Sequence, residues 1–527
     1  MSQSSAPPIF GETRLTAGRL EALTDRIDAE SEVSIGVRTP ITDEEIGRVP
    51  SCTASDVEAA VDRARAAQSS WERVPVEARA ETLRRFGDLV LERREQLLDV
   101  LQLETGKSRR HGVEEVLDVP LTASYYAERG SSMLADERRG GAIPLATDAR
   151  VTVDPVGVVG IIAPWNYPLT LAVTDAIPAL LAGNAVVLKP DEKTPFVALA
   201  LAELLEEAGL PEGVLEVVTG DGPTVGPALI DRVDYVAFTG STETGRTVAE
   251  RAGRNLIDCS LELGGKNPSV VLADADLETA ARGAVHGAFT NAGQLCLAPE
   301  RMYVEESRYE AFLDAFVGAT RGLSMGLEFE YGPDVGSLID GDQLERVETH
   351  VAEAVESGAS VLSGGRHRPD VGPYCYEPTI LTDVDPGSRV ACEETFGPVV
   401  SVTPVPDIEA AIEAANDSPY GLNASVWTSD RERGVQVARE IDCGTVCVND
   451  AYTAGWAAVD APMGGVGDSG LGRRHGPEGL RRYTEPRTIA VSRMGPLDAP
   501  PGVPTSVAVR ALTGLTRLQR RLLRWVR

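Results

Sequence analysis

A cysteine and a glutamate in two glycine-containing segments are the residues of this 527-residue chain best suited to covalent chemistry. Cys296 ends the run Asn291-Ala-Gly-Gln-Leu-Cys296, and Glu262 lies 34 residues earlier in Leu261-Glu-Leu-Gly-Gly-Lys266. A thiolate attacks a carbonyl carbon, and a carboxylate activates the water that releases the product. Because most unpaired cysteines are small buried hydrophobes, this interpretation depends on the motifs around the two residues.

The composition is that of a soluble globular protein of two or three domains, with 43% hydrophobic and 25% charged residues. There are 80 Asp and Glu against 50 Lys and Arg, a net charge of −30 that disfavours nucleic acid as a partner. Lysine occurs only at Lys107, Lys189, Lys193 and Lys266. Two explanations stay open: adaptation to a salty cytoplasm, and a codon bias that favours arginine.

Several features predict a cytoplasmic location. The seven cysteines are scattered and form no CxxC pair, as expected of reduced thiols. Met1 to Phe10 lacks the charged and apolar regions of a secretory signal, and the longest apolar run, Ala176 to Leu188, is too short to span a bilayer. The five isolated histidines predict no metal site.

The order of helical and β-branched runs predicts two α/β domains in series. A lead-in of about 50 residues with a short hairpin precedes a helical stretch from Ala54 to Gly106. From Val151 to about Leu272, short β-branched runs alternate with helical runs, as in a doubly wound parallel sheet. A second alternation extends from Arg301 to Asn449. The strand runs of the first region are Val156–Ile162, Ala185–Leu188, Val214–Val218, Tyr235–Thr239 and Ser269–Leu272.

Three motifs follow predicted strands, where ligands of such sheets bind. They are Pro164-Trp-Asn-Tyr-Pro168, Lys189-Pro-Asp-Glu192 and the glycine-rich turn Thr239-Gly-Ser-Thr-Glu-Thr-Gly245, which opens a helix. The helix start suits a pyrophosphate. Any one motif is weak evidence; together they indicate a Rossmann-like dinucleotide site.

From about residue 40 to residue 495 the chain resembles the NAD(P)-dependent aldehyde dehydrogenase superfamily. The resemblance is carried by PWNYP at 164–168, KPDEKTP at 189–195, FTGSTETG at 238–245, LELGGKNP at 261–268 and NAGQLC at 291–296. Later segments, such as Glu393-Glu-Thr-Phe-Gly-Pro398, agree as well. Within the superfamily, the region from Ser469 to Gly479 is most similar to a branch named as succinate-semialdehyde dehydrogenases.

The resemblance implies an NAD-binding domain at 1–140 and 156–265, and a second α/β catalytic domain at 266–465. It also implies a β-arm for oligomerisation at 141–155 and 480–494, and therefore a homodimer or homotetramer.

The resemblance also implies the reaction. Cys296 would form a thiohemiacetal with the aldehyde, Asn166 would hold the charged oxygen, and Glu262 would activate water against the thioester left after hydride transfer. Cofactor-binding roles are implied for twelve positions: Ile162, Pro164, Trp165, Lys189, Glu192, Gly222, Gly240, Ser241, Gly245, Leu263, Glu394 and Phe396.

Glu192 bears on the choice of cofactor, because the resemblance places it at the adenine-ribose 2′ position. A carboxylate accepts a hydrogen bond from a 2′-hydroxyl and repels a 2′-phosphate. We therefore expect NAD to be preferred, while the neighbouring Lys193 keeps NADP possible.

The substrate stays open between succinate semialdehyde and another aliphatic aldehyde. Members that oxidise succinate semialdehyde often carry an arginine in the helix after the PWN turn, whereas Thr170 to Asp175 holds an acid. Met463 and Gly467 replace the usual phenylalanine and lysine. Two other functions compete: a CoA-acylating dehydrogenase, which has no use for Glu262, and a non-catalytic relative with a binding or structural role.

The tail at 500–527 is predicted to be a basic amphipathic helix that follows a proline-rich break. Leucines recur at helical steps from Leu512 to Leu522, and six arginines occur without an acid. Two destinations are open: the acidic surface of this chain or of a neighbouring subunit, and an anionic membrane face.

Overall fold

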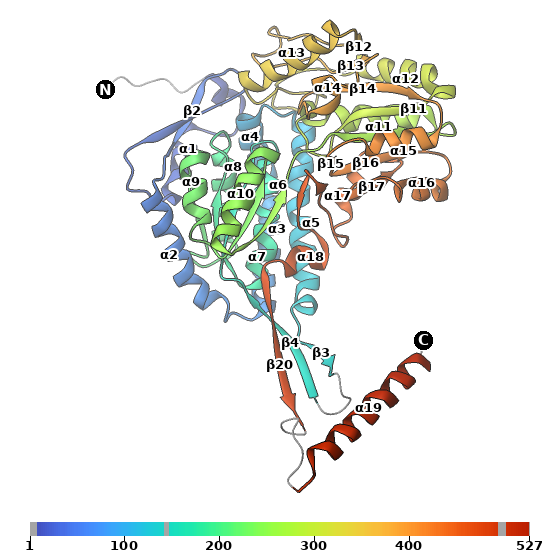
Figure 1. Ribbon diagram of the computed structural model, residues 1–527. Coiled ribbons are helices and arrows are strands. Elements are labelled where there is room, and N and C mark those ends of the chain that lie inside the picture. Colours follow the sequence, from blue (N-terminus) through green and yellow to red (C-terminus); the bar gives the residue numbers. More distant parts are fainter. Residues whose placement is uncertain (1–7, 142–146, 494–501, 526–527) are drawn as a thin grey trace.

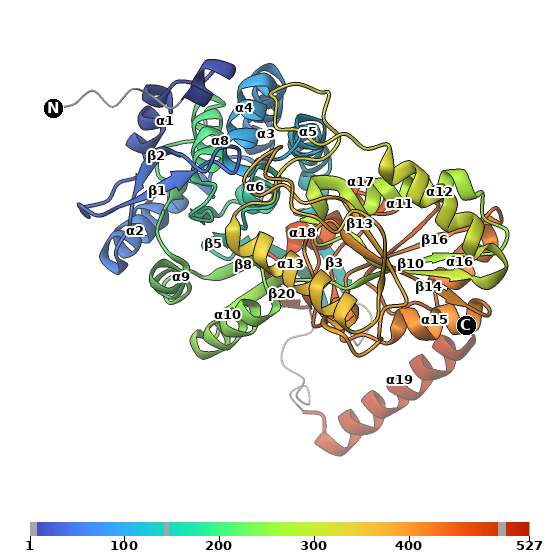
Figure 2. The ribbon, with the colours of Figure 1, turned by 90° about the horizontal axis from the view of Figure 1, so that it is seen from above.

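The computed structural model describes residues 8–141, 147–493 and 502–525, and for residues 522–525 it describes the backbone alone. Two α/β units lie side by side (Figures 1 and 2), and a narrow β-arm projects from them (Figure 1). The proline break at Pro500-Pro501, and the side chains of Leu522 and Trp525, lie outside the described residues.

The first sheet has the strand order β19-β9-β8-β5-β6-β7. All its pairings are parallel except β19 with β9. Its central strands are apolar runs, buried almost throughout because helices cover both faces. The strands are β5 Val158–Ile162, β6 Ala185–Lys189, β7 Leu215–Val217, β8 Tyr235–Thr239, β9 Asp258–Glu262 and β19 Gly470–Leu471.

The helices of this part belong to one continuous apolar core with the sheet. They are α1 Ala17–Leu23, α2 Ala54–Trp71, α3 Val76–Glu92, α4 Arg94–Thr105, α5 Arg109–Met133, α6 Pro168–Val173, α7 Ala176–Ala182, α8 Pro195–Glu207, α9 Gly222–Ile230 and α10 Thr242–Asn255. The expected helical stretch from Ala54 to Gly106 is thus three helices. Pro75 is the N-cap of α3, and Arg93 separates α3 from α4. The lead-in hairpin is β1 Ser34–Arg38 with β2 Glu45–Pro50.

The second sheet has the order β12-β13-β14-β11-β10-β16-β17. Its strands are β10 Asn267–Val271, β11 Pro299–Glu305, β12 Ser360–Ser363, β13 Thr379–Thr382, β14 Val399–Val405, β16 Asn423–Trp427 and β17 Thr445–Val448. Its helices are α11 Leu277–Phe289, α12 Tyr309–Arg321, α13 Gly341–Glu356, α14 Arg389–Cys392, α15 Ile408–Asn416, α16 Arg431–Ala438 and α17 Thr453–Ala457. Although it comes late in the chain, α18 Gly476–Arg481 packs on α5 and α7, and its Leu480 belongs to the core of the first sheet. A two-stranded sheet pairs β15 Tyr420–Gly421 with β18 Val466–Gly467.

One strand assignment from the sequence was wrong. The run Ser269–Leu272 was grouped with the first region, but it lies in β10, which pairs with β11 and β16 of the second sheet. A buried apolar run shows that a strand is central without showing which sheet it joins.

The arm is a three-stranded antiparallel sheet in which β4 Thr147–Pro155 pairs with β20 Thr484–Ser492 and with β3 Glu137–Gly140. After the arm comes α19 Thr505–Trp525, set apart from both α/β units (Figure 1). No helix among the described residues is long and apolar enough to cross a bilayer.

Candidate active site

The parallel strands of the first sheet bring the sequence motifs to one edge. Ile162, Lys189, Thr239 and Glu262 are the last residues of β5, β6, β8 and β9. Because these strands are parallel neighbours, their carboxyl ends lie together. The turn with Pro164, Trp165 and Asn166 follows β5 directly.

Cys296 is presented by a tight turn at the end of α11. Asn291 and Ala292 have φ of 52° and 53°, a conformation that costs non-glycine residues about 1–3 kcal/mol each. Gly293 follows at φ 72°, where a Cβ would lie 2.0 Å from the carbonyl oxygen of Gly397. The turn is held because Asn291 N donates to His111 Nδ1 over 3.1 Å. Strain at this point, in a turn fixed by several hydrogen bonds, is typical of a functional loop.

Cys296, Glu262 and Asn166 line one cavity between the two sheets. The rest of the wall is largely apolar or aromatic. It consists of Tyr167, Leu171, Thr239, Leu295, Leu422, Trp456, Met463 and Arg474. The nucleophile, base and oxyanion donor expected from the sequence therefore share one chamber.

Glu262 has the titration range of a general base. Burial raises the pKa of its carboxyl group to about 7, although the positive charges of Arg474 and Arg482 oppose the rise. Its Oε1 is buried without a hydrogen-bond partner among the described residues. A carboxylate that is ionised near neutrality and has a free lone pair is suited to take a proton from a thiol or from water.

Cys296 is a protonated thiol in this arrangement. Burial raises the pKa of the thiol to about 12, and the negative charges of Glu394 and Glu262 add to the rise. The thiol therefore needs a base before it attacks a carbonyl, and Glu262 is the carboxylate on the same cavity wall.

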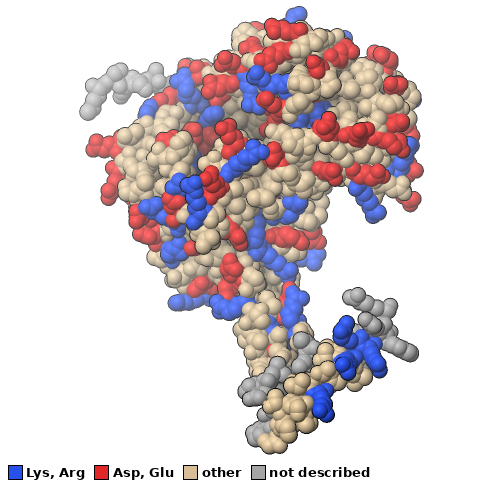
Figure 3. Space-filling view, viewed as in Figure 1, with Lys and Arg blue, Asp and Glu red and all other residues tan. Residues whose placement is uncertain are grey.

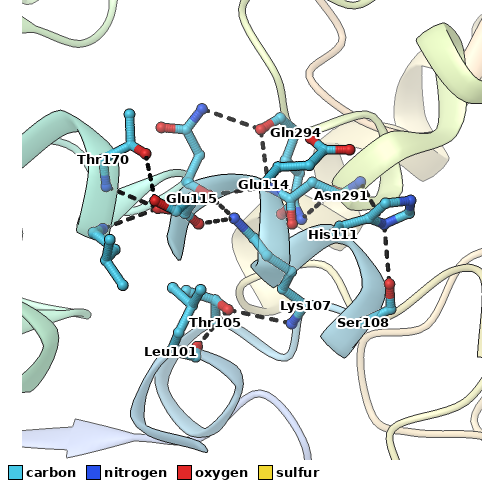
Figure 4. A network of polar contacts seen from close by, with 12 residues as sticks. Leu101, Thr105, Lys107, Ser108, His111, Glu114, Glu115, Thr170, Asn291 and Gln294 are labelled. Carbon is cyan, nitrogen blue, oxygen red and sulfur yellow. Dashed lines mark hydrogen bonds and ion pairs between the residues drawn. The ribbon is translucent and has the colours of Figure 1, made fainter. Parts of the chain in front are cut away.

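The backbone of Asn166 is held by a buried ion pair between Lys107 and Glu115, which the sequence did not predict. Figure 4 shows this pair. Lys107 Nζ donates to the Asn166 carbonyl oxygen over 2.9 Å and pairs with Glu115. The second Glu115 oxygen accepts the N–H groups of Leu169 and Thr170 at the start of α6. Asn166 Nδ2 donates to Gln294 O over 3.1 Å, which leaves its second N–H for a substrate oxygen.

Glu394 lies between α14 and β14, and its side chain contacts the segment that links β9 to β10. Its Oε1 accepts the Gly265 N–H over 2.9 Å, and burial raises the pKa of its carboxyl group to about 8. Close by, the ring of Phe396 meets that of Trp165 edge to face at 5.5 Å. Glu300, another residue without a sequence motif, accepts the Phe396 and Thr395 N–H groups and pairs with buried Lys266.

Most of the other proposed cofactor residues lie at the ends of β6 to β9. Ser241 caps α10 by accepting the Thr244 N–H, and Gly222 opens α9 with open space beside its Cα. Side chains at Gly240 and Gly245 would meet Phe238 and Leu263 within 2.5 Å. A glycine-lined helix start, with buried Lys189 two strands away, has the donor set that a dinucleotide needs, so these residues fit NAD(P).

The rarity of lysine in the sequence could have indicated that Lys107 belongs to the site. Lys107, Lys189 and Lys266 are buried, and all four lysines lie beside the proposed catalytic or cofactor residues. In a chain that otherwise uses arginine, each remaining lysine marks a place where a compact ammonium group is needed. Arg474 and Glu300 carry no comparable signal. In the described residues no group of three His, Cys, Asp or Glu is arranged to hold a metal.

Comparison with known proteins agrees with this geometry. Residues 27–489 match the family model described as "Aldehyde dehydrogenase family". A Mycobacterium tuberculosis protein named "Putative succinate-semialdehyde dehydrogenase (NADP+) 2" is 48% identical over 499 residues, which cover 95% of this chain and 96% of the relative. The phenylacetaldehyde dehydrogenase of Pseudomonas fluorescens is 39% identical over 477 residues, covering 88% and 94%.

Solved structures are similar over nearly the same extent. Betaine aldehyde dehydrogenase from Staphylococcus aureus, in complex with NAD+, has a TM-score of 0.85 at 33% identity and covers 90% of this chain and 96% of its own. An NADP-dependent enzyme from E. coli has a TM-score of 0.85 at 36% identity, covering 88% and 96%.

Proposed function

Because this chain belongs to the aldehyde dehydrogenase family, we propose that it oxidises an aliphatic aldehyde to the acid and prefers NAD over NADP. The observation that supports this most directly is the single cavity lined by Cys296, Glu262 and Asn166. A competing CoA-acylating function has no hydrolysis step and so would not need Glu262 to activate water, and a non-catalytic relative would need neither Glu262 nor the thiol.

The residues divide the reaction into two steps. Glu262 takes the Cys296 proton as Sγ bonds to the aldehyde carbon, and the Asn166 Nδ2–H and the Cys296 N–H hold the oxygen that gains the negative charge. Bound NAD supplies the hydride acceptor, after which an acyl thioester remains on Cys296. Once Glu262 has lost its proton to solvent, it deprotonates the water that attacks the thioester carbon; the C–S bond then breaks, the Cys296 sulfur takes back a proton from Glu262, and the acid leaves.

The preference for NAD is supported by charges near the end of β6. Glu192 is two-fifths exposed, and its Oε2 lies 3.8 Å from Lys189 Nζ. Lys193, which could offset that acid, instead binds Asp340 Oδ2 over 2.7 Å. A 2′-phosphate at this point would meet the Glu192 carboxylate, while the Lys193 ammonium is already engaged by Asp340. Initial rates with each cofactor test the proposal, and equal kcat/KM values for NAD and NADP would contradict it.

The cavity wall supports an uncharged aliphatic aldehyde as the substrate. Tyr167, Leu171 and Met463 are apolar contacts, while half-buried Glu114 and buried Asp118 accept hydrogen bonds from Tyr452 and Trp456. Buried carboxylates disfavour a second anion nearby. One observation favours succinate semialdehyde as an alternative: Arg474 lies on the same wall.

A panel of aldehydes, with and without CoA, separates these functions through NADH formation. Higher kcat/KM for aliphatic aldehydes of similar length than for succinate semialdehyde is expected. A preference for the semialdehyde would assign its carboxylate to Arg474. If acyl-CoA is the only product, the thioester is transferred to CoA and is not hydrolysed. If no aldehyde yields NADH, the non-catalytic role is favoured.

We also propose a homodimer or homotetramer that forms through the arm, in the cytoplasm. Support comes from β20, whose second edge is unpaired among the described strands and whose Ile489 and Val491 are exposed. The seven cysteines are all free, as suits a reducing compartment. Native mass tests the assembly, and a monomer at micromolar concentration would contradict it.

A further inference from the structure

The two faces of α19 differ sharply in chemistry. Val507, Leu515 and Leu518 lie on one side of the helix at steps of eight and three residues, and each is about half exposed. Arg510, Arg517 and Arg521 follow the other side. There is no acid from residue 500 to the end of the chain, in a protein with 80 acidic residues.

No described part of the chain covers the apolar face of α19. Among the side chains of α19 that the structure describes, all but two are exposed, and the exposed ones include Val509 and Leu512. Figure 3 shows the helix as a separate basic and apolar body beyond the mixed acidic and basic surface of the two α/β units. Contiguous exposed apolar surface of this kind marks a site of interaction.

The arm holds α19 away from the acidic part of the molecule. Strands β4 and β20 have nine residues each and span about 30 Å. That length exceeds the Debye length of about 8 Å at physiological salt. Salt therefore screens the repulsion between the acidic α/β units and an anionic surface bound by α19. The arginines of α19 contact that surface directly and attract it.

We propose that α19 is an interfacial helix that binds the protein to an anionic lipid membrane, with its apolar side chains among the acyl chains and its arginines on lipid phosphates. The helix has the composition of this class: a basic polar face, leucines and valines opposite, and no length of apolar sequence that would cross the bilayer. Anionic headgroups complement a helix that carries arginine and no acid.

A membrane fits this helix better than a second copy of the chain does. A protein partner must offer an apolar groove to an apolar helix face. Among the described residues outside α19, the exposed large hydrophobics occur singly, such as Leu91 on α3 and Val435 on α16, or in pairs, such as Leu117 with Leu121 on α5 and Ile489 with Val491 on β20. A lipid surface needs no such groove.

The test is co-sedimentation of the full chain with vesicles of phosphatidylcholine alone or with added phosphatidylglycerol. Binding that requires phosphatidylglycerol and falls as salt is raised is expected. The variant Arg510→Gln/Arg517→Gln/Arg521→Gln should bind at least about tenfold more weakly. A control with the same charge change on the body, Arg85→Gln/Arg254→Gln/Arg431→Gln, should bind as the unmodified chain does. Leu515→Gln/Leu518→Gln should also lose binding, although its charge is unchanged.

Two outcomes overturn the proposal. Full-length protein that stays in the supernatant with anionic vesicles excludes a membrane role, and equal loss in the tail and body variants reduces the effect to net charge. If vesicle binding is absent and the tail variants have a lower native mass, α19 docks on a second copy instead. NADH formation by the variants shows that they are folded, because α19 contributes no residue to the cavity around Cys296.

Discussion

Arg474 Nη2 donates to Oδ2 of Asp175 over 2.6 Å; both side chains are buried, and Arg474 lines the cavity that holds Glu262. Arg482 binds the other oxygen of the same carboxylate. Burial alone would raise the pKa of Asp175, but the two guanidinium groups hold it below its usual range. Two cations against one carboxylate leave a positive charge that favours the ionised form of Glu262.

Arg474→Gln should move the pH dependence of thioester hydrolysis to higher pH. Glu262 acts as a base, so hydrolysis rises as pH increases through its pKa of about 7, and Arg474 opposes the effect of burial on that pKa. Without the cation the pKa of Glu262 is higher, so the variant hydrolyses the thioester more slowly than the unmodified enzyme at pH 7. At high pH the rates of the two enzymes converge. Single-turnover acyl hydrolysis across pH measures this shift. Arg474→Lys, which keeps the positive charge, should have a pH dependence close to that of the unmodified enzyme. A uniform loss at every pH would limit Arg474 to a structural role.

Glu262→Gln should release a burst of about one NADH per site and then stall. Because Glu262 serves as base in both steps, the test is run at high pH, where the thiol loses its proton to solvent hydroxide; acylation and hydride transfer then proceed, and the later activation of water still lacks its base. The measurement is rapid-mixing absorbance at alkaline pH. Glu278→Gln, an exposed change on α11, is the control and should turn over steadily. Steady turnover by the Glu262 variant would show that another base activates the water.

Cys296→Ala should abolish NADH formation and leave NAD binding measurable, because most of the proposed dinucleotide contacts lie at the ends of β5 to β9 and Cys296 is not among them. Titration of intrinsic fluorescence measures binding alongside the assay. Cys392→Ala removes an exposed thiol from α14 and should leave both unchanged. Turnover in the Cys296 variant would remove that thiol from the mechanism.

What the sequence predicted well is local. The apolar runs of β5, β6 and β8, and the glycine and proline turns that follow them, depend on neighbouring residues and were visible without a structure. Placing β10 failed because its sheet is decided by pairing with β11 and β16, far along the chain.

The residues that support the site were mostly missed for a related reason. Glu115 lies in α5 among other charged residues, and nothing near it in sequence shows that its oxygens meet Lys107 and the start of α6. Arg474 resembles the many other arginines until Asp175, 299 residues earlier, is placed against it. Burial of a charge is a tertiary property, so short motifs do not record it.

Asn166→Ala should lower kcat by about 10²–10³ and change KM little, because its second amide N–H serves an oxygen that is charged only as the reaction proceeds. Steady-state kinetics with one aldehyde and saturating NAD measure the effect. Asn255→Ala, at the end of α10, is the control. An increase in KM alone would mean that Asn166 binds the substrate without stabilising the charged oxygen.

Lys107→Met should destabilise the protein by about 3–5 kcal/mol, since it leaves the buried Glu115 carboxylate without its cation. The same change removes the donor to the Asn166 carbonyl oxygen, so kcat should fall as well. Denaturant unfolding and steady-state kinetics measure the two effects. In Lys107→Met/Glu115→Gln neither charge of this buried pair remains, so much of the stability should return, while kcat stays low because the Asn166 carbonyl oxygen keeps the Asn291 Nδ2–H donor but has lost the Lys107 ammonium. If kcat recovers together with stability, Lys107 matters for folding alone and does not position the oxyanion donor.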